Sequence, residues 1–121
     1  MKKIYLAIPY TGIEEISCLA VNEITAKLIL QDYCVFSPIS HSHNISLLDD
    51  GSKITYQQWM NQDLEFLTLC DAVYVVDLIN HHGLSLIYNS KGVMQEIEWA
   101  REFNKELKMI KYNTETKQLE I

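Results

Sequence analysis

The sequence predicts an α/β protein: a small doubly wound, three-layer sandwich of the Rossmann or flavodoxin type, with a mostly parallel sheet of four strands. Short apolar runs alternate with longer segments of helical periodicity, in the order β-α-β-α-β-α-β. The connecting segments are long enough to form the helical crossovers that parallel pairing requires. A chain of 121 residues with 48% hydrophobic content can bury one core, so we expect residues 1–121 to form a single domain.

The first third of the chain predicts one βαβ unit. Residues 4–8 form an apolar run that ends at Pro9, which suits a buried central strand whose backbone then leaves the sheet. Residues 13–31 carry apolar side chains at helical spacing, and residues 34–37 form a second apolar run. Because such crossovers are almost always right-handed, the second strand should lie beside the first, with the helix packed over both.

The middle of the chain predicts a long loop, a helix and a strand. Residues 38–52 are rich in Ser, His, Asn and Asp, which favours a polar loop longer than most connections in compact domains. Thr55 can cap a helix over residues 56–69. Residues 72–76 form a near-continuous apolar run that ends at Asp77, as expected for a buried parallel strand.

The last third predicts a second long loop, a helix and a closing strand. Residues 78–89 lack clear periodicity, so we interpret them as a loop at the same sheet edge as the first. Ser90 can cap the helix that follows, and residues 107–112 suit the closing strand. From Asn113 the sequence is polar, so we expect the tail to fray or to pack against another subunit.

Composition and charge favour a small ligand over a polymer. The net charge of −6 argues against a nucleic-acid binder, since such proteins cluster Lys and Arg to neutralise phosphates. Cys18, Cys34 and Cys70 are odd in number and lie in apolar segments, which favours reduced packing residues. The sequence shows no cleavable leader pattern and no apolar run of roughly 20 residues. We therefore expect a cytoplasmic protein without membrane contact.

Two acidic residues are predicted to face the core. At roughly 100° per residue, Glu96 points toward the apolar face of its helix and Glu98 points away from it. The same arithmetic turns Asp63 toward the apolar face of the helix over residues 56–69. Core-facing acids are rare unless a function needs them, so the pair indicates a site. A structural alternative stays open, in which both acids pair with Lys, Arg or backbone groups at the rim of the core.

Open α/β sheets bind ligands outside the carboxyl ends of their strands, and polar segments gather at that edge here. These segments are residues 9–12, residues 38–44, Asp77 and residues 90–92. Ser90 and Gly92 open a helix, where free N–H groups and the helix dipole favour a phosphate or a sugar hydroxyl. His41 and His43 form a pair without a third ligand, which favours contact with a substrate over a metal site.

Four motifs carry a resemblance to a known family. They are Tyr-Leu-Ala-Ile-Pro-Tyr at residues 5–10, Phe-Ser-Pro-Ile-Ser-His at residues 36–41, Asp63 ahead of Cys-Asp-Ala at residues 70–72, and Ser90-x-Gly92-x-x-x-Glu96. Through them, most of the chain resembles the nucleoside 2-deoxyribosyltransferase-like family, which includes deoxynucleoside 5′-monophosphate N-glycosidases and small bacterial and phage relatives. The resemblance implies action on the N-glycosidic bond of a 2′-deoxyribonucleoside or its 5′-monophosphate, by transfer to another base or to water.

The resemblance also implies roles for individual residues. The residue matching Glu96 is the nucleophile that forms a covalent deoxyribosyl intermediate, and the residue matching Asp63 assists protonation of the departing base. Such a pair suits an oxocarbenium-like transition state, because one carboxylate stabilises the sugar cation while an acid protonates the leaving nitrogen. Tyr5 lies at the start of a strand, from which a phenol could hydrogen-bond the catalytic carboxylate.

The expected substrate contacts come from the same sheet edge. They are Ala7, Pro9 and Tyr10 beside the sugar and base, Ser90 and Gly92 at the 5′ end, and His41. Because the carboxylates supply the charge stabilisation, no metal or organic cofactor is expected. By analogy with the family, we expect a homo-oligomer, a dimer or an assembly of dimers, that completes the pocket across a subunit interface.

Two departures from the family pattern bear on the substrate. The transferases carry an aspartate where this chain has Ser90, whereas the monophosphate glycosidases have a serine that contacts phosphate, so Ser90 favours nucleotides. The turn at residues 10–12 lacks the arginine that often helps to bind phosphate in the glycosidases. The alternative function is a non-catalytic nucleotide-binding sensor or regulatory module on the same fold, which the change at Ser90 makes credible.

Overall fold

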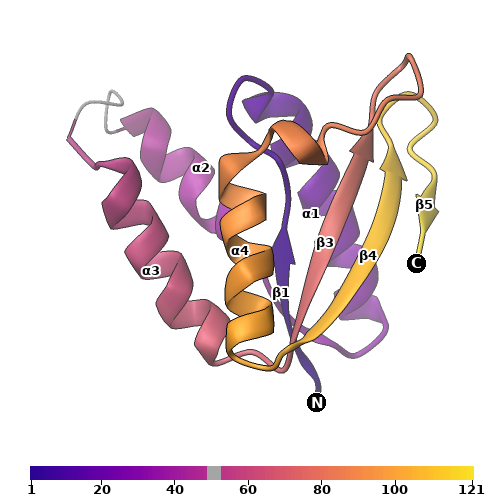
Figure 1. The fold of residues 1–121 in the computed structure, drawn as a ribbon. Helices are drawn as coiled ribbons and strands as arrows, with labels where there is room; N and C mark the ends of the chain where they lie inside the picture. The colour runs from indigo at the N-terminus through magenta and orange to yellow at the C-terminus, as the bar shows by residue number, and fades with distance from the viewer. Residues whose placement is uncertain (49–52) are drawn as a thin grey trace.

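A computed structural model describes residues 1–48 and 53–121 and shows an α/β sandwich of three layers (Figure 1). The elements in chain order are β1 (Lys3–Ala7), α1 (Glu14–Leu30), β2 (Cys34–Phe36), α2 (Pro38–Leu48), α3 (Tyr56–Thr68), β3 (Ala72–Ile79), the 3₁₀ turn η1 (Ile87–Asn89), α4 (Lys91–Glu102), β4 (Glu106–Asn113) and β5 (Leu119–Glu120). The predicted doubly wound α/β class is confirmed.

The sheet has the strand order β2-β1-β3-β4-β5, and β1, β2, β3 and β4 run parallel to one another. The predicted neighbourhood of the first two strands is confirmed, since Lys3 of β1 pairs with Cys34 of β2. The chain leaves β1 toward β2 on one side and returns to β3 on the other side. This order creates a switch point at the carboxyl end of β1, where such sheets bind ligands.

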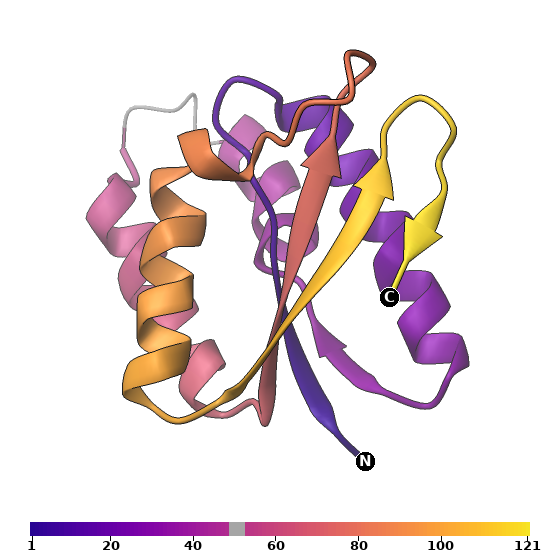
Figure 2. The same cartoon turned by 45° about the vertical axis from the view of Figure 1, so that its right-hand side comes forward.

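The predicted number of four strands is wrong, because β5 adds an antiparallel edge beside β4 (Figure 2). Asn113 makes the reversal possible. Its Oδ1 accepts hydrogen bonds from the backbone N–H groups of Glu115 at 2.9 Å and Thr116 at 3.0 Å, which closes a tight turn. The tail therefore pairs with the sheet of its own chain instead of fraying.

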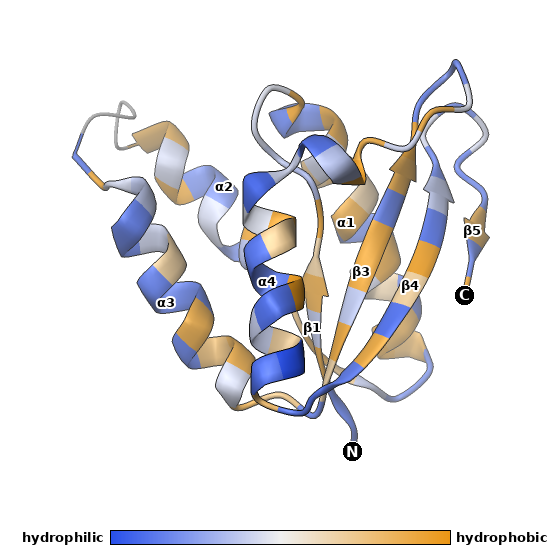
Figure 3. Cartoon of the chain, viewed as in Figure 1, coloured by the Kyte–Doolittle hydropathy of each residue, from blue (hydrophilic) through white to orange (hydrophobic). Residues whose placement is uncertain are grey.

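Helices cover both faces of the sheet, and β1 contributes to the core on each face. Leu6 lies in the core beneath α1, whereas Tyr5 lies in the core beneath α3 and α4. This alternation follows from the opposite directions of successive side chains in a strand. Figure 3 shows β1 and β3 as mostly apolar, while polar and apolar residues alternate along α3 and α4. Tyr5 is thus aimed at the layer that carries both candidate acids.

Residues 38–48 form helix α2, so the prediction of a loop over residues 38–52 is wrong for this part, and residues 49–52 lie outside the described residues. Pro38 occupies the first helical position, where its fixed φ and missing N–H are tolerated. The hydroxyl of Ser37 accepts a hydrogen bond from the N–H of Ser40 at 3.3 Å. This capping outweighs the low helix propensity of the Ser and His residues that follow.

Residues 78–89 are only partly a loop. β3 continues to Ile79, and the chain then turns at Asn80, whose Oδ1 accepts hydrogen bonds from the N–H groups of His82 and Leu84. An isolated backbone bridge and η1 order the remainder. Periodicity misses this segment because local side-chain-to-backbone bonds, rather than an apolar stripe, organise it.

Both predicted helix caps are present. Thr55 and Gln58 form a reciprocal capping box at the start of α3, with hydrogen bonds of 3.1 and 2.9 Å. The hydroxyl of Ser90 accepts a hydrogen bond from the N–H of Val93 at 3.2 Å and so caps α4. α3 carries Asp63 and α4 carries Glu96, so the two caps fix where the helices that carry these acids begin.

Two expectations from composition can be compared with the structure. The three cysteines are free, and Cys70 is buried, but Cys34 is exposed, so its prediction as a packing residue is wrong. β2, which begins at Cys34, is an edge strand of the sheet in the part of the chain that the structure describes.

In the described parts of the chain, no helix combines the length and apolar character needed to cross a bilayer.

Candidate functional site

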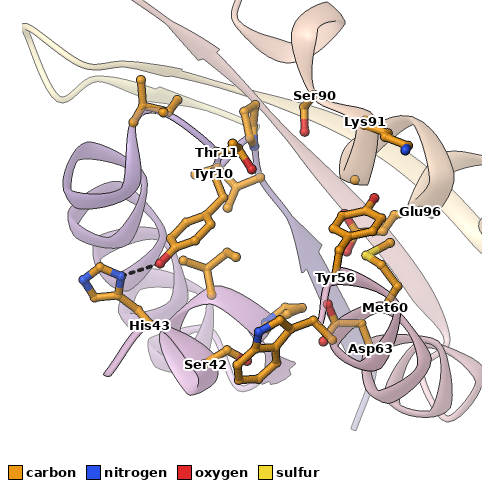
Figure 4. Close-up of a pocket in the computed structure, with 18 of the residues that line it drawn as sticks. Tyr10, Thr11, Ser42, His43, Tyr56, Met60, Asp63, Ser90, Lys91 and Glu96 are labelled. Atoms are coloured by element: carbon orange, nitrogen blue, oxygen red, sulfur yellow. Dashed lines mark hydrogen bonds between the residues drawn. The ribbon is translucent and has the colours of Figure 1, made fainter. Parts of the chain in front are cut away.

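A pocket of about 650 Å³ lies beside the carboxyl end of β1, at the switch point of the sheet (Figure 4). Its volume falls in the range of small-molecule sites. Its walls come from the β1–α1 loop, α2, α3 and the junction of η1 with α4. Apolar side chains that line it include Leu6, Ile8, Pro38, Ile39 and Met60. Four separate segments of the chain therefore meet around one cavity.

Glu96 is held on the inner side of α4. Val93, Glu96 and Ala100 are the buried residues of this helix, whereas Glu98 is exposed, as the helical spacing predicts. Glu96 keeps 7% of its surface exposed and lines the pocket. The phenol of Tyr5, which is fully buried, donates a hydrogen bond to Oε2 of Glu96. One carboxylate oxygen is thus fixed from the sheet.

Asp63 enters the same pocket from α3, and Figure 4 shows its side chain and that of Glu96 on the same side of the cavity. Oδ1 of Asp63 is buried and has no hydrogen-bond partner among the described residues. Neither acid forms an ion pair within residues 1–48 and 53–121. The alternative of two acids neutralised by Lys or Arg at the core rim therefore finds no support in the described structure. A buried oxygen without a partner is typical of a position that a ligand or water completes.

Burial shifts the titration of both acids upward. Loss of hydration raises the pKa of Asp63 to about 6. Loss of hydration also raises the pKa of Glu96 to about 8, where the hydrogen bond from Tyr5 lowers the pKa and the negative charge of Asp63 raises it further. Between these values the pair holds one proton. Carboxyl groups that share a proton near neutral pH are typical of acid–base catalysis.

The start of α4 supplies polar groups on the side of the pocket next to Glu96. Ser90 and Gly92 line the pocket, and Lys91 is the only Lys or Arg that does so in the described structure. Nζ of Lys91 lies 5.4 Å from the ring centroid of Tyr56, which projects from the first turn of α3. This contact joins α3 and α4 at the pocket, and Lys91 brings one positively charged side chain to the lining.

The wall formed by the β1–α1 loop and α2 also holds a group of polar side chains, none of them an acid. The hydroxyl of Tyr10 lies 2.7 Å from Nδ1 of His43, and the two rings meet edge to face at 5.8 Å between centroids. The hydroxyl of Ser46 lies 3.5 Å from the Tyr10 oxygen and donates a hydrogen bond to the His43 carbonyl at 2.6 Å. Figure 4 shows Tyr10 and His43 across the cavity from Glu96 and Asp63.

Comparison with known proteins adds the family. Residues 2–111 match a family model described as "Domain of unknown function (DUF1937)". The chain belongs to the DUF1937 family. Its sequence finds no match among curated proteins.

Two solved structures are similar to the DUF1937 chain. A 2-deoxyribosyltransferase from the psychrotolerant bacterium Bacillus psychrosaccharolyticus superposes with a TM-score of 0.63 at 20% identity, over 90% of this chain and 72% of that protein. A 2-desoxiribosyltransferase from Leishmania mexicana superposes with a TM-score of 0.60 at 18% identity, over 93% of this chain and 65% of that protein. The DUF1937 chain therefore spans less than two thirds of the Leishmania protein. The likeness confirms the predicted resemblance at the level of the fold.

The DUF1937 domain brings together most of the residues that the sequence singles out. Pro9, Tyr10, Ser90 and Gly92 line the pocket with the two acids. Ala7 does not line it, because its side chain is buried in the core beneath α3 and α4. Tyr5 also lies outside the lining and reaches the site through Glu96.

His41 and Asp77 are placed differently from the prediction. His41 is exposed and does not line the pocket, since it lies on another side of α2 and packs near Phe36 and Phe66. The histidine that does line the pocket is His43. Asp77 accepts a hydrogen bond from the hydroxyl of Ser85 and lies outside the pocket lining.

The pocket residues that sequence reasoning missed include Ser42, Tyr56, Trp59 and Lys91. The helical spacing of Ile39, Ser42, His43 and Ser46 could have predicted one face of α2, had residues 38–48 been recognised as a helix. Tyr56, Trp59, Met60 and Asp63 follow the same spacing on α3. No group of three or more His, Cys, Asp or Glu suited to a metal occurs in the part of the chain that the structure describes.

Proposed function

We propose that this DUF1937 domain cleaves or transfers the N-glycosidic bond of a 2′-deoxyribonucleoside or its 5′-monophosphate. The observation that supports this proposal most strongly is a pair of largely buried acids, Glu96 and Asp63, which line one cavity without a cationic partner among the described residues. Keeping two acids in such a place costs stability, so a function must maintain them. An oxocarbenium-like transition state is a chemistry that such a pair serves.

In the proposed reaction Glu96 is the nucleophile. Its oxygen Oε1 bonds to C1′ of the deoxyribose while the C1′–N bond breaks, and the bond electrons pass to the base nitrogen. Asp63 gives its proton to the leaving base, which departs neutral. Water or a second base then attacks C1′, displaces Glu96 and returns a proton to Asp63. Tyr5 positions Glu96 by holding Oε2, which leaves Oε1 directed at the sugar.

The two carboxyl groups can divide the work through one of the two forms of the singly protonated pair. A nucleophilic carboxylate and a carboxylic acid together need one proton, and the pKa values of about 6 and about 8 leave one proton on the pair near neutral pH. Because Glu96 has the higher pKa, this proton lies mostly on Glu96, and the reactive form is the less populated one, in which Asp63 carries the proton. Anionic Glu96 then faces the cation that develops at C1′, in a site that excludes most of the water.

The 5′ end of the substrate is assigned to the start of α4. Ser90 and Gly92 lie at the first turn of this helix, where free N–H groups attract oxygen atoms and anions. Lys91 adds a full positive charge. A 5′-phosphate suits this end better than a free hydroxyl does, because it would meet the charge of Lys91 without meeting a carboxylate at position 90.

The test is release of free base from a panel of 2′-deoxynucleosides and their 5′-monophosphates, with and without an acceptor base. We expect base release by the natural chain and its loss in Glu96→Gln, which keeps the size of the side chain and removes its charge. Glu98→Gln, on the exposed side of the same helix, is the matched control. A 2-fluoro-2-deoxyribosyl analogue should add covalently to Glu96, with the mass increase on the peptide that contains it.

The alternative, a nucleotide sensor, predicts a different pattern. It predicts that the ligands bind with measurable affinity, that no base is released, and that Glu96→Ala leaves binding intact. Binding measured by calorimetry beside the release assay therefore separates the two functions.

A further inference from the structure

Tyr10, His43 and Ser46 form a hydrogen-bonded group in the wall of the pocket. Nδ1 of His43 lies 2.7 Å from the Tyr10 hydroxyl, and the hydroxyl of Ser46 is held by the His43 carbonyl one turn earlier in α2. Each of these residues lines the pocket. The phenol of Tyr10 is therefore held in one position at the side of the cavity away from the acids.

A second observation concerns Ser42, the neighbour of His43 on α2. Its hydroxyl oxygen is buried and has no hydrogen-bond partner among the described residues, although it lines the same pocket. Asp63 carries another such oxygen in this cavity. The third, on Thr25, belongs to α1 and lies outside the pocket lining. Buried hydroxyls are nearly always paired, so Ser42 lacks a partner that a ligand or water would supply.

The pocket also offers apolar surface to a flat ligand. Ile39, Trp59 and Met60 are among the residues that line it. If the sugar lies at Glu96 and Asp63, the base extends between these side chains toward Tyr10 and Ser42. Its faces then meet apolar surface and its edge meets the hydroxyls, which is the usual arrangement of a specific small-molecule site.

We propose that Tyr10 and Ser42 read the edge of the nucleobase, that His43 is the positioning residue for Tyr10, and that this arrangement selects bases with an exocyclic amino group. The inference rests on the proposed function and specifies its substrate. In the tautomer of His43 that carries its proton on Nε2, Nδ1 accepts the phenol proton, so the Tyr10 oxygen offers lone pairs to the ligand. The proton of Ser46 is already given to the His43 carbonyl. An amino group on the base then donates to Tyr10, while Ser42 can donate to the neighbouring ring nitrogen.

The test compares substrates that differ only at this edge. They are 2′-deoxyadenosine against purine 2′-deoxyriboside and 2′-deoxyinosine, and 2′-deoxycytidine against 2′-deoxyuridine, each as nucleoside and as 5′-monophosphate. We expect higher kcat/KM for the amino-bearing member of each set. In Tyr10→Phe, the ratio of kcat/KM for 2′-deoxyadenosine to that for purine 2′-deoxyriboside should fall roughly 10-fold, the effect of one lost buried hydrogen bond. Ser42→Ala should lower the same ratio.

Two further variants separate positioning from packing. His43→Phe should lower the ratio as Tyr10→Phe does, and His43→Asn, which keeps a polar group near Nδ1, should restore part of it. Ser40→Ala is the matched control on α2, because its hydroxyl bonds to Asn22 and it does not line the pocket. A merely structural role of Tyr10 or His43 would lower kcat/KM for all substrates alike and leave the ratio unchanged.

The outcomes distinguish this inference from the proposed function. Base release by the natural chain with no change of the ratio in Tyr10→Phe, or a preference for the keto bases, would overturn the inference alone. No base release from any substrate would overturn the proposed function. In that case, calorimetric titration of 2′-deoxyadenosine and purine 2′-deoxyriboside still tests whether Tyr10 and Ser42 distinguish bases by the amino group at their edge. Equal affinities of the natural chain for the two nucleosides would reject the inference.

Discussion

The phenol of Tyr5 donates a hydrogen bond to Oε2 of Glu96, so a fully buried residue of the central sheet holds a carboxylate that lines the pocket. The bond spans 91 positions of the sequence. It stabilises the ionised form of Glu96 against the cost of burial, because a donor favours the charged state of its acceptor. Glu96 therefore keeps a pKa at which it can ionise near neutral pH.

The first prediction is a bell-shaped dependence of kcat/KM on pH. Below a pH of about 6 both acids are protonated and Glu96 cannot attack, and above a pH of about 8 both are ionised and Asp63 cannot protonate the base. Activity should therefore rise through the lower value and fall through the upper one. Initial rates of base release across this range provide the measurement. A flat profile would contradict the assignment of the two roles.

The second prediction concerns Tyr5→Phe. Without the donor, the pKa of Glu96 rises further, so the single proton resides on Glu96 more of the time and the reactive form becomes rarer. The maximum of kcat/KM should fall roughly 10-fold or more, given the strength of a hydrogen bond to a charged group. The alkaline limb of the profile should move to higher pH.

Tyr74→Phe is a suitable control, since Tyr74 lies in the core beneath α1 and does not touch Glu96. If Tyr5 served packing alone, its variant would lose activity without a displacement of the alkaline limb.

The third prediction concerns stability and Glu96→Gln. The pKa of Glu96 is about 8 in the folded chain and near 4.5 in a free side chain, so the folded state binds the proton more tightly. This contribution to stability is complete below pH 4.5 and is lost as the pH rises through about 8. Gln carries no such proton. The variant should therefore gain stability relative to the natural chain across this range, on the order of 4 kcal/mol in the free energy of unfolding.

Urea unfolding at several pH values gives the measurement for this third prediction, with Glu98→Gln as the exposed control. A difference between the natural chain and Glu96→Gln that stays constant with pH would show that burial does not raise the pKa of Glu96.

The core topology follows from the sequence, because short apolar runs and segments of helical periodicity report burial directly. α2 escaped prediction because Ser37 and Pro38 start it, while its Ser and His residues favour loops. The same error left open that His43 lines the pocket and His41 does not, since only a helix shows which of two alternate residues faces the pocket. Glu96 and Asp63 lie on segments that were predicted as helices, so helical spacing gave the direction of both side chains correctly.

The fourth prediction concerns Lys91→Met. Loss of the only Lys or Arg that lines the described pocket should raise KM for a 5′-monophosphate relative to that for the nucleoside by about 3- to 10-fold, as for one partly exposed charge pair. Steady-state kinetics on a matched nucleoside and nucleotide measure the ratio. Lys108→Met is the control, because Lys108 makes a similar contact with the ring of Tyr74 at 5.6 Å. An equal change in both KM values would assign Lys91 to the Tyr56 contact alone.

The fifth prediction concerns self-association. α1 and α2 pack against each other and expose large apolar side chains, including Leu19 at 69%, Leu30 at 84% and Leu48 at 90%. Apolar exposure of this kind marks interaction surfaces in folded domains. We expect the chain to form a dimer or a larger even assembly, and Leu19→Glu to shift it toward the monomer, because burial of a charge at an interface is unfavourable.

Sedimentation of the natural chain and the variants tests self-association at α1. Leu84→Glu is the matched control, since Leu84 is 62% exposed but lies in the turn after β3. If Leu84→Glu dissociates the assembly and Leu19→Glu does not, the interface lies at the end of β3, near η1 and the pocket, instead of on α1. If the natural chain sediments as a monomer at all concentrations, each subunit must bind its substrate within the pocket of its own chain.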